Sequence, residues 1–330
     1  MNHTEEEGVF TVKYAGLAGE EEEKQQEPVK YCVLCGEANP VKVKFCGECA
    51  STRFAPTREE ALSLRLDTYL QEIEEKYNRA KWFYWEKKYE DAYALFFEAA
   101  DAGHTEAQNC LGYLSERGLG VQKDGGEALR WYLKAAVKGS EKALNNLGNC
   151  YFYGRGTERN RDEAIDFYGK AASLNHLSAI YNLGQFYCFY DEERRYEEGA
   201  KHYKKAALQG HEGAMNALGV LYSSGKGVER DENEAFRWYA QAAKRNSAAG
   251  QNNLGECYYA GEGTKKDFAL AVKWFEKAAS QGYSRAKFNL GWCYYFGQGA
   301  KKRRGAGTAL IKEAAKAGDP SAIEFLKRRK

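Results

Sequence analysis

The chain has 330 residues, of which 43% are hydrophobic and 14% aromatic, which is enough apolar material for a packed core. Its 34 Gly and only 4 Pro suit short helices joined by glycine turns and exclude a collagen-like chain. The formal net charge of +2 conceals acidic residues 1–27, with eight Glu against two Lys, and basic residues 301–330, with ten Lys or Arg against three acids. Because blocks of like charge are typical of solvated segments, we expect residues 1–27 to form a disordered acidic tail.

Membrane insertion and secretion have no support in the sequence. No apolar run reaches the roughly 18 residues that a spanning helix needs, and the acidic start lacks the basic-then-apolar order of a secretory signal. We therefore expect an intracellular, cytoplasmic location.

Residues 28–54 carry four of the nine cysteines, as Cys32-x-x-Cys35 and Cys46-x-x-Cys49. Two such pairs supply the four thiolates of a tetrahedral zinc site. The segment resembles the short form of the zinc-ribbon family, which implies a structural zinc. So short a segment has almost no core, whereas structural zinc can contribute ~10–16 kcal/mol, so we expect the metal to decide its folding. Disulfides or a redox pair are the alternatives.

Residues 55–103 predict helices. Thr57 followed by Glu60 forms a capping box that opens the first of them. The segment that follows resembles an ordinary tetratricopeptide unit in the positions of Ala80, Phe83, Tyr89, Ala92, Phe96 and Ala99.

A Leu-Gly pair then recurs at steps of 36, 36, 35, 36 and 36 residues. A fixed period of this length indicates one helical unit copied along a solenoid. The pairs are Leu111-Gly112, Leu147-Gly148, Leu183-Gly184, Leu218-Gly219, Leu254-Gly255 and Leu290-Gly291.

Each unit predicts two helices, because apolar residues recur at spacings of three and four on either side of a glycine corner. Asp124, Asn160, Asp231 and Asp267 stand where they cap the second helix. His104, His176 and His211 all fall at the entry to a first helix, which favours a turn or cap role over catalysis.

The pattern Ala-x-x-x-Leu-Gly-x-x-Tyr, Gly-x-Gly, Asp-x-x-x-Ala-x-x-Trp-Tyr-x-x-Ala-Ala resembles the Sel-one-like repeat, a relative of the tetratricopeptide repeat. The resemblance covers six copies over residues 104–318 and implies an all-α fold, a right-handed solenoid of stacked helix pairs. Residues 319–330 repeat the start of the unit and are expected to form a capping helix.

The third copy departs from the others, because it has lost both corner glycines and one residue, which predicts a local change in the superhelix. Cys150, Cys257 and Cys293 occupy positions where other copies have Leu or Phe, so we expect them to be buried. Their positions within the repeat place Cys110 and Cys188 on the groove instead, so we expect these two thiols to be the most available for reaction.

By analogy with tetratricopeptide repeats, first helices line a concave groove. Two rows of Asn precede the repeat leucines there, and carboxamides suit the main chain of an extended peptide. The alternative is that these Asn join adjacent repeats. The groove residues we select are Asn146, Asn182, Asn253 and Asn289 with the aromatic side chains of Tyr259, Trp292 and Tyr295.

No nucleophile with a matched base occurs, so the sequence favours a non-enzymatic scaffold that binds a peptide or protein, with the zinc ribbon as a second docking module. The alternative is binding of nucleic acid or another anionic partner by the basic C-terminal cluster and the ribbon residues Lys30, Lys42, Lys44 and Arg53.

Overall fold

The computed structural model describes residues 29–41, 43–44, 46, 48–49 and 51–328. The predicted acidic tail, residues 1–27, and the predicted ribbon contact Lys42 lie outside the described residues. The chain divides into two compact units between Glu72 and Ile73, inside one long helix.

The N-terminal unit contains a small antiparallel sheet of order β2-β1-β3, with strands β1 (Val29–Cys32), β2 (Ala38–Pro40) and β3 (Phe54–Ala55). Helix α1 (Arg58–Trp85) begins after the Thr57 hydroxyl accepts a hydrogen bond from the Glu60 amide, at 3.1 Å, as the capping box predicts. Val33, Ala55 and Ala61 form the buried core of this unit, which is small.

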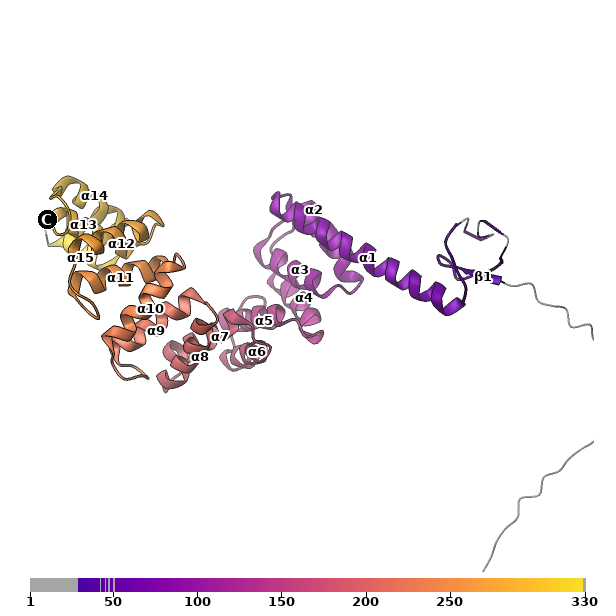
Figure 1. Ribbon diagram of the computed structural model, residues 1–330, viewed down its shortest axis with the longest axis horizontal. Helices are drawn as coiled ribbons and strands as arrows, with labels where there is room; N and C mark the ends of the chain where they lie inside the picture. The colour runs from indigo at the N-terminus through magenta and orange to yellow at the C-terminus, as the bar shows by residue number, and fades with distance from the viewer. Residues whose placement is uncertain (1–28, 42, 45, 47, 50, 329–330) are drawn as a thin grey trace, which may run out of the picture. The chain divides into compact units, whose positions relative to one another are not determined.

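The second unit is a series of antiparallel helix pairs that follow one another in chain order (Figure 1). Helix α2 (Tyr89–Asp101) precedes the six copies of the repeat, and α15 (Pro320–Lys327) follows them. The pairs are α3 (Thr105–Arg117) with α4 (Gly125–Val137), α5 (Glu141–Tyr153) with α6 (Arg161–Ser173), α7 (Leu177–Gln185) with α8 (Tyr196–Leu208), α9 (Glu212–Ser224) with α10 (Glu232–Lys244), α11 (Ala248–Ala260) with α12 (Phe268–Ser280), and α13 (Ser284–Phe296) with α14 (Arg304–Lys316). The predicted all-α solenoid is confirmed.

The helices begin where the sequence places their caps. Asp124, Asn160, Asp231 and Asp267 each accept a hydrogen bond from a backbone amide of the first turn that follows. The three histidines also cap helices, since the side chains of His104, His176 and His211 accept from the amides of Ala107, Ala179 and Ala214. The predicted cap role of these histidines is confirmed.

The Leu-Gly glycines are explained by helix packing within a pair. A Cβ on Gly148 would lie 2.5 Å from the ring of Tyr168, far inside contact distance. The same clash with a tyrosine of the second helix would occur at Gly112, Gly184 and Gly219. Only glycine therefore lets the two helices of a pair approach this closely.

The third copy replaces the glycine corner with a single π-helical turn, Phe186–Tyr190, which closes when the Asp191 amide donates to the Phe186 carbonyl at 3.0 Å. This wider turn rotates Cys188 into the core, where it is 0% exposed and faces Gly199. The prediction that Cys188 lies on the groove is therefore wrong, because the π turn shifts the helical register. Burial raises the pKa of its thiol to about 11.

The other repeat cysteines divide as follows. Cys150, Cys257 and Cys293 are buried, as predicted. Cys110 is partly exposed, but burial raises the pKa of its thiol to about 11, so it is not an activated nucleophile.

No helix among the described residues combines the length and apolar character that a membrane crossing requires.

Candidate partner groove and metal centre

The four cysteines of the N-terminal unit converge on one point. The sulfur atoms of Cys32, Cys35, Cys46 and Cys49 all lie within 4.8 Å of one another. Neighbouring sulfur atoms are separated by 3.4–3.6 Å, close to the roughly 3.8 Å edge of a tetrahedron with Zn–S bonds of about 2.3 Å. The donor set and its spacing therefore fit a four-thiolate zinc site.

The backbone favours a thiolate at Cys32, whereas at Cys35 and Cys49 the backbone hydrogen bonds are outweighed by burial and the neighbouring sulfur atoms, which raise the pKa of both thiols. Burial acts to raise the pKa of Cys32, but hydrogen bonds from the Cys35 and Leu34 backbones outweigh it and hold the pKa at about 6. The Leu34 amide lies 3.3 Å from the Cys32 sulfur. The Asn39 carboxamide, which is buried, donates to the Cys46 sulfur at 3.6 Å. Hydrogen bonds to the sulfur atoms orient metal-binding thiolates and offset their negative charge.

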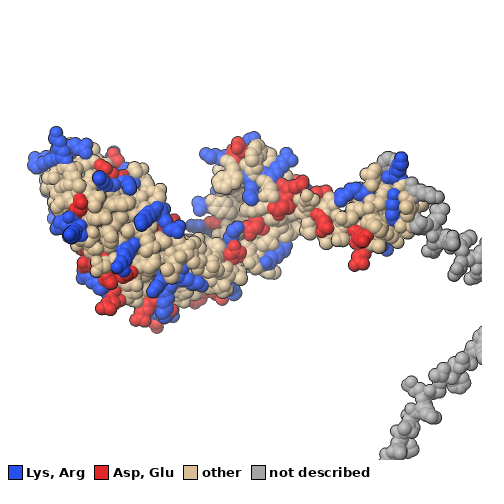
Figure 2. Space-filling view, in the orientation of Figure 1, with Lys and Arg blue, Asp and Glu red and all other residues tan. Residues whose placement is uncertain are grey.

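The basic residues predicted to contact an anionic partner are distributed over both units. In the N-terminal unit, the Lys30 ammonium donates to the Val43 carbonyl at 2.6 Å and lies over the Phe54 ring, while Arg53 donates to Thr68. In the second unit, residues 301–304 are all exposed, and Figure 2 shows Lys and Arg side chains gathered at the end of the array where α14 lies.

The two rows of asparagines form a ladder between adjacent repeats. In each rung, the Asn directly before one repeat leucine donates to the Asn two residues before the leucine of the preceding repeat. The four rungs are Asn146 to Asn109 (3.0 Å), Asn182 to Asn145 (3.0 Å), Asn253 to Asn216 (2.8 Å) and Asn289 to Asn252 (3.0 Å). The asparagines therefore join repeats, which was the alternative left open by the sequence.

The ladder is interrupted between the third and fourth repeats. Tyr181 and Ala217 stand where the rung asparagines would be. Tyr181 stacks instead on the cap residue His211, with ring centroids 4.4 Å apart. A second such stack, Tyr77 on His104 at 4.3 Å, precedes the first rung. Tyrosine–histidine stacking thus replaces the amide pair between the third and fourth repeats.

A cleft of about 510 Å³ opens between α11, α13 and α15, at the C-terminal end of the ladder. Its lining includes three of the predicted groove residues, Tyr259, Asn289 and Trp292. Asn253 lines a neighbouring cavity of about 230 Å³. Tyr295 is only 9% exposed and lines neither cavity, because α13 turns it towards the core.

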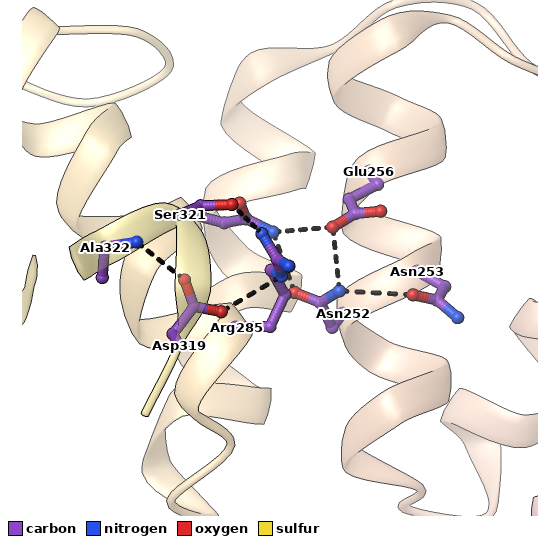
Figure 3. Close-up of polar contacts among 8 residues, drawn as sticks. Asn252, Asn253, Glu256, Arg285, Asp319, Ser321 and Ala322 are labelled. Atoms are coloured by element: carbon purple, nitrogen blue, oxygen red, sulfur yellow. Dashed lines mark hydrogen bonds and ion pairs between the residues drawn. The ribbon is translucent and has the colours of Figure 1, made fainter. Parts of the chain in front are cut away.

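Helix α15 is attached to the array by a polar network (Figure 3), of which Ser321 also lines the cleft. Arg285 on α13 forms an ion pair with Asp319 at 3.2 Å and donates to the Ser321 hydroxyl at 2.5 Å. Asp319 is buried and also caps α15 by accepting from the Ala322 amide at 2.9 Å. The short last helix therefore has a defined position.

On α11, on the other side of the cleft from α15, two carboxamides hold Glu256. One carboxylate oxygen of Glu256 accepts from Asn252 at 3.0 Å and from Asn289 at 2.9 Å (Figure 3). Phe288 and Phe325 line the cleft beside Glu256.

We did not select Glu256, Phe288 or Phe325 from the sequence, although the positions of the first two relative to their repeat leucines indicate the groove. Glu256 lies two residues after its repeat leucine and Phe288 two residues before, and both are groove positions. Phe325 belongs to the terminal helix, where no repeat comparison applies.

Comparison with protein-family models places the Sel1 repeat on residues 105–140, 141–176, 177–211, 213–247, 248–283 and 284–319, with a partial match at 86–104. The partial match lies in the segment that the sequence assigns to a tetratricopeptide-like unit. A comparison with curated proteins gave no match.

Two solved structures are similar over most of this chain. A Sel1 repeat protein from Oxalobacter formigenes is 32% identical, with a TM-score of 0.66, and the alignment covers 72% of this chain and 96% of that one. The protective antigen c5321 of uropathogenic Escherichia coli is 30% identical, with a TM-score of 0.67, and covers 80% of this chain, which spans 58% of the antigen's length. Solenoids of such repeats generally serve as scaffolds for protein–protein interaction. Because the Sel1 repeat model matches most of this chain, the chain belongs to the Sel1 repeat family.

Proposed function

We propose that this protein is a non-enzymatic scaffold that binds a peptide or protein segment on the ladder side of its repeats, in the cleft between α11, α13 and α15. The observation that carries the proposal is the composition of this cleft. It combines half-buried aromatic side chains, Trp292, Phe288 and Tyr259, with the carboxamide of Asn289. Aromatic side chains in a concave site are typical hot spots for protein partners.

The zinc ribbon is proposed as a second docking module. Its four-cysteine cluster fits structural zinc. A metal-stabilised module of this size presents surface rather than a catalytic pocket, since all four ligand positions come from the protein.

Capture of partners by tagged full-length protein tests the scaffold proposal. Trp292→Ala should lose the main partner, because it removes the largest aromatic face of the cleft. The matched control is Trp85→Ala, which truncates a tryptophan that is 77% exposed on α1 and should keep the partner. Equal capture by the two variants would place recognition on another surface.

Binding of nucleic acid is the second candidate function. The observation that favours it is the run of four exposed cations at residues 301–304. Two of them lie over aromatic rings, Arg303 over Tyr294 at 4.0 Å and Arg304 over Tyr295 at 5.7 Å, an arrangement that also suits stacking on bases.

A further inference from the structure

We propose that the cleft between α11, α13 and α15 binds a cationic side chain, Lys or Arg, presented by a basic peptide segment of a partner protein. This inference deepens the proposed function and rests on it. It identifies the chemistry of the partner, which the repeat architecture by itself does not.

The position of Glu256 is the first reason. Two amide donors, from Asn252 and Asn289, meet one of its carboxylate oxygens and fix the group at the cleft. No Lys or Arg forms an ion pair with Glu256 within the described part of the chain. A carboxylate held in place beside an aromatic cleft, without a cation of its own, is a preorganised site for a charge-assisted hydrogen bond.

The aromatic walls are the second reason. Trp292 packs with three further rings, its centroid lying 4.5 Å from that of Phe296, 5.7 Å from that of Phe325 and 5.9 Å from that of Phe288. The face of an indole attracts Lys and Arg more strongly than other rings do, and the rings also accept the methylene stem of these side chains. The cleft thus matches both the charged end and the apolar stem of a basic residue.

The charges that line the cleft also favour a cationic ligand. Two acidic residues, Glu256 and Glu324, line the cleft against one basic residue, Arg328, which is itself paired with Glu324. The neighbouring cavity contains Glu232, Glu256 and Glu262 and no cation, although Glu232 pairs with Arg230. The two adjoining hollows are therefore net acidic and would repel an acidic peptide.

A peptide rather than a free amine is indicated by the ladder beside the cleft. Asn253, in the neighbouring cavity, uses one N–H for Asn216 and one lone pair for Asn252. A carboxamide has two donors and two acceptor sites, so one of each remains for a main-chain amide. An extended segment can thus bond to the ladder while its basic side chain enters the cleft.

Selection of a random peptide library displayed on phage against the full-length protein tests this inference. We expect the selected peptides to share Lys or Arg at one position. Their affinities are then measured by fluorescence anisotropy for wild type, Glu256→Gln and Trp292→Ala. Glutamine keeps the acceptor for Asn252 and Asn289 and removes only the charge, so Glu256→Gln should weaken binding at least about fivefold.

The control is Glu229→Gln, which removes an exposed carboxylate on the loop before α10 and should change affinity by less than about twofold. Replacing the peptide lysine with norleucine keeps the stem and removes the charge. This should weaken binding to wild type but not to Glu256→Gln, since the two changes remove the same interaction.

The outcomes separate this inference from the proposed function. Peptides that require Trp292 but bind equally well with norleucine, or to Glu256→Gln, would leave the scaffold intact and overturn the cationic anchor. Failure to select any peptide would contradict both. A dimer dissolved both by Glu256→Gln and by alanine at residues 301–304 would identify a second copy as the occupant and overturn the assignment to a separate partner.

Discussion

Replacing Asn252 with alanine should destabilise the repeat array although the residue lies beside a candidate binding site. Asn252 is 1% exposed, and its carboxamide donates to Glu256 and Asn253 and accepts from Asn289. Each hydrogen bond contributes about 0.5–1.5 kcal/mol net, and the groups left behind are partly exposed and can bind water, so we expect a loss of about 2–3 kcal/mol. For a unit of this size, that corresponds to a fall in Tm of about 5–10 °C.

The assay is thermal unfolding followed by circular dichroism, with amide hydrogen exchange to locate the effect. Exchange should accelerate in α11 and α13, which the rung joins, and stay unchanged in α3. The control is Asn233→Ala on the exposed face of α10, which should stay within about 0.5 kcal/mol of wild type. If Asn252→Ala unfolded at the same temperature as this control, the ladder would not be a source of stability.

Three further predictions concern the packing, the metal and the basic cluster. Gly148→Ala should lower the free energy of unfolding by about 1–3 kcal/mol, measured by chemical denaturation, because its Cβ meets a tyrosine ring. Gly169→Ala is the control and should stabilise α6 by up to about 1 kcal/mol, since no atom lies within 4 Å of its Cβ. Equal effects would contradict the packing argument. Elemental analysis should find about one zinc per chain. Replacing Cys46 and Cys49 with Ser should remove the zinc but keep the helical circular dichroism signal. An ordered ribbon with reduced thiols and no zinc would refute the site. Binding to single-stranded RNA through residues 301–304 should weaken steeply between about 50 and 200 mM salt and when these four residues are replaced with alanine. No binding at low salt would remove that function.

The repeat pattern predicted the fold because its signals are local. The Leu-Gly period, the cap residues and the buried cysteines all depend on which residue occupies a given position of one helix pair. His176, for example, could be assigned to a cap from its place before a helix, and its side chain accepts from the Ala179 amide at 3.3 Å.

The site was less predictable because it depends on contacts between repeats. Asn289 could be placed near the groove, but its bond to Asn252 depends on the offset between neighbouring first helices, which the sequence of one repeat does not determine. The prediction for Cys188 is wrong because the lost corner glycines indicate a local change in the third repeat but do not specify a π turn or the register that it sets. The ion pair of Arg285 with Asp319 lies at the junction with α15, beyond the regular period.

The most direct test of the central claim is photo-crosslinking from the cleft. Benzoylphenylalanine in place of Trp292 reports which chain lies against α13 in the full-length protein, and the same probe in place of Trp85 is the control. We expect irradiation to join position 292 to a partner segment that contains Lys or Arg, with no such product from position 85. A partner that crosslinks from position 85 and not from position 292 would show that the cleft is not the binding site.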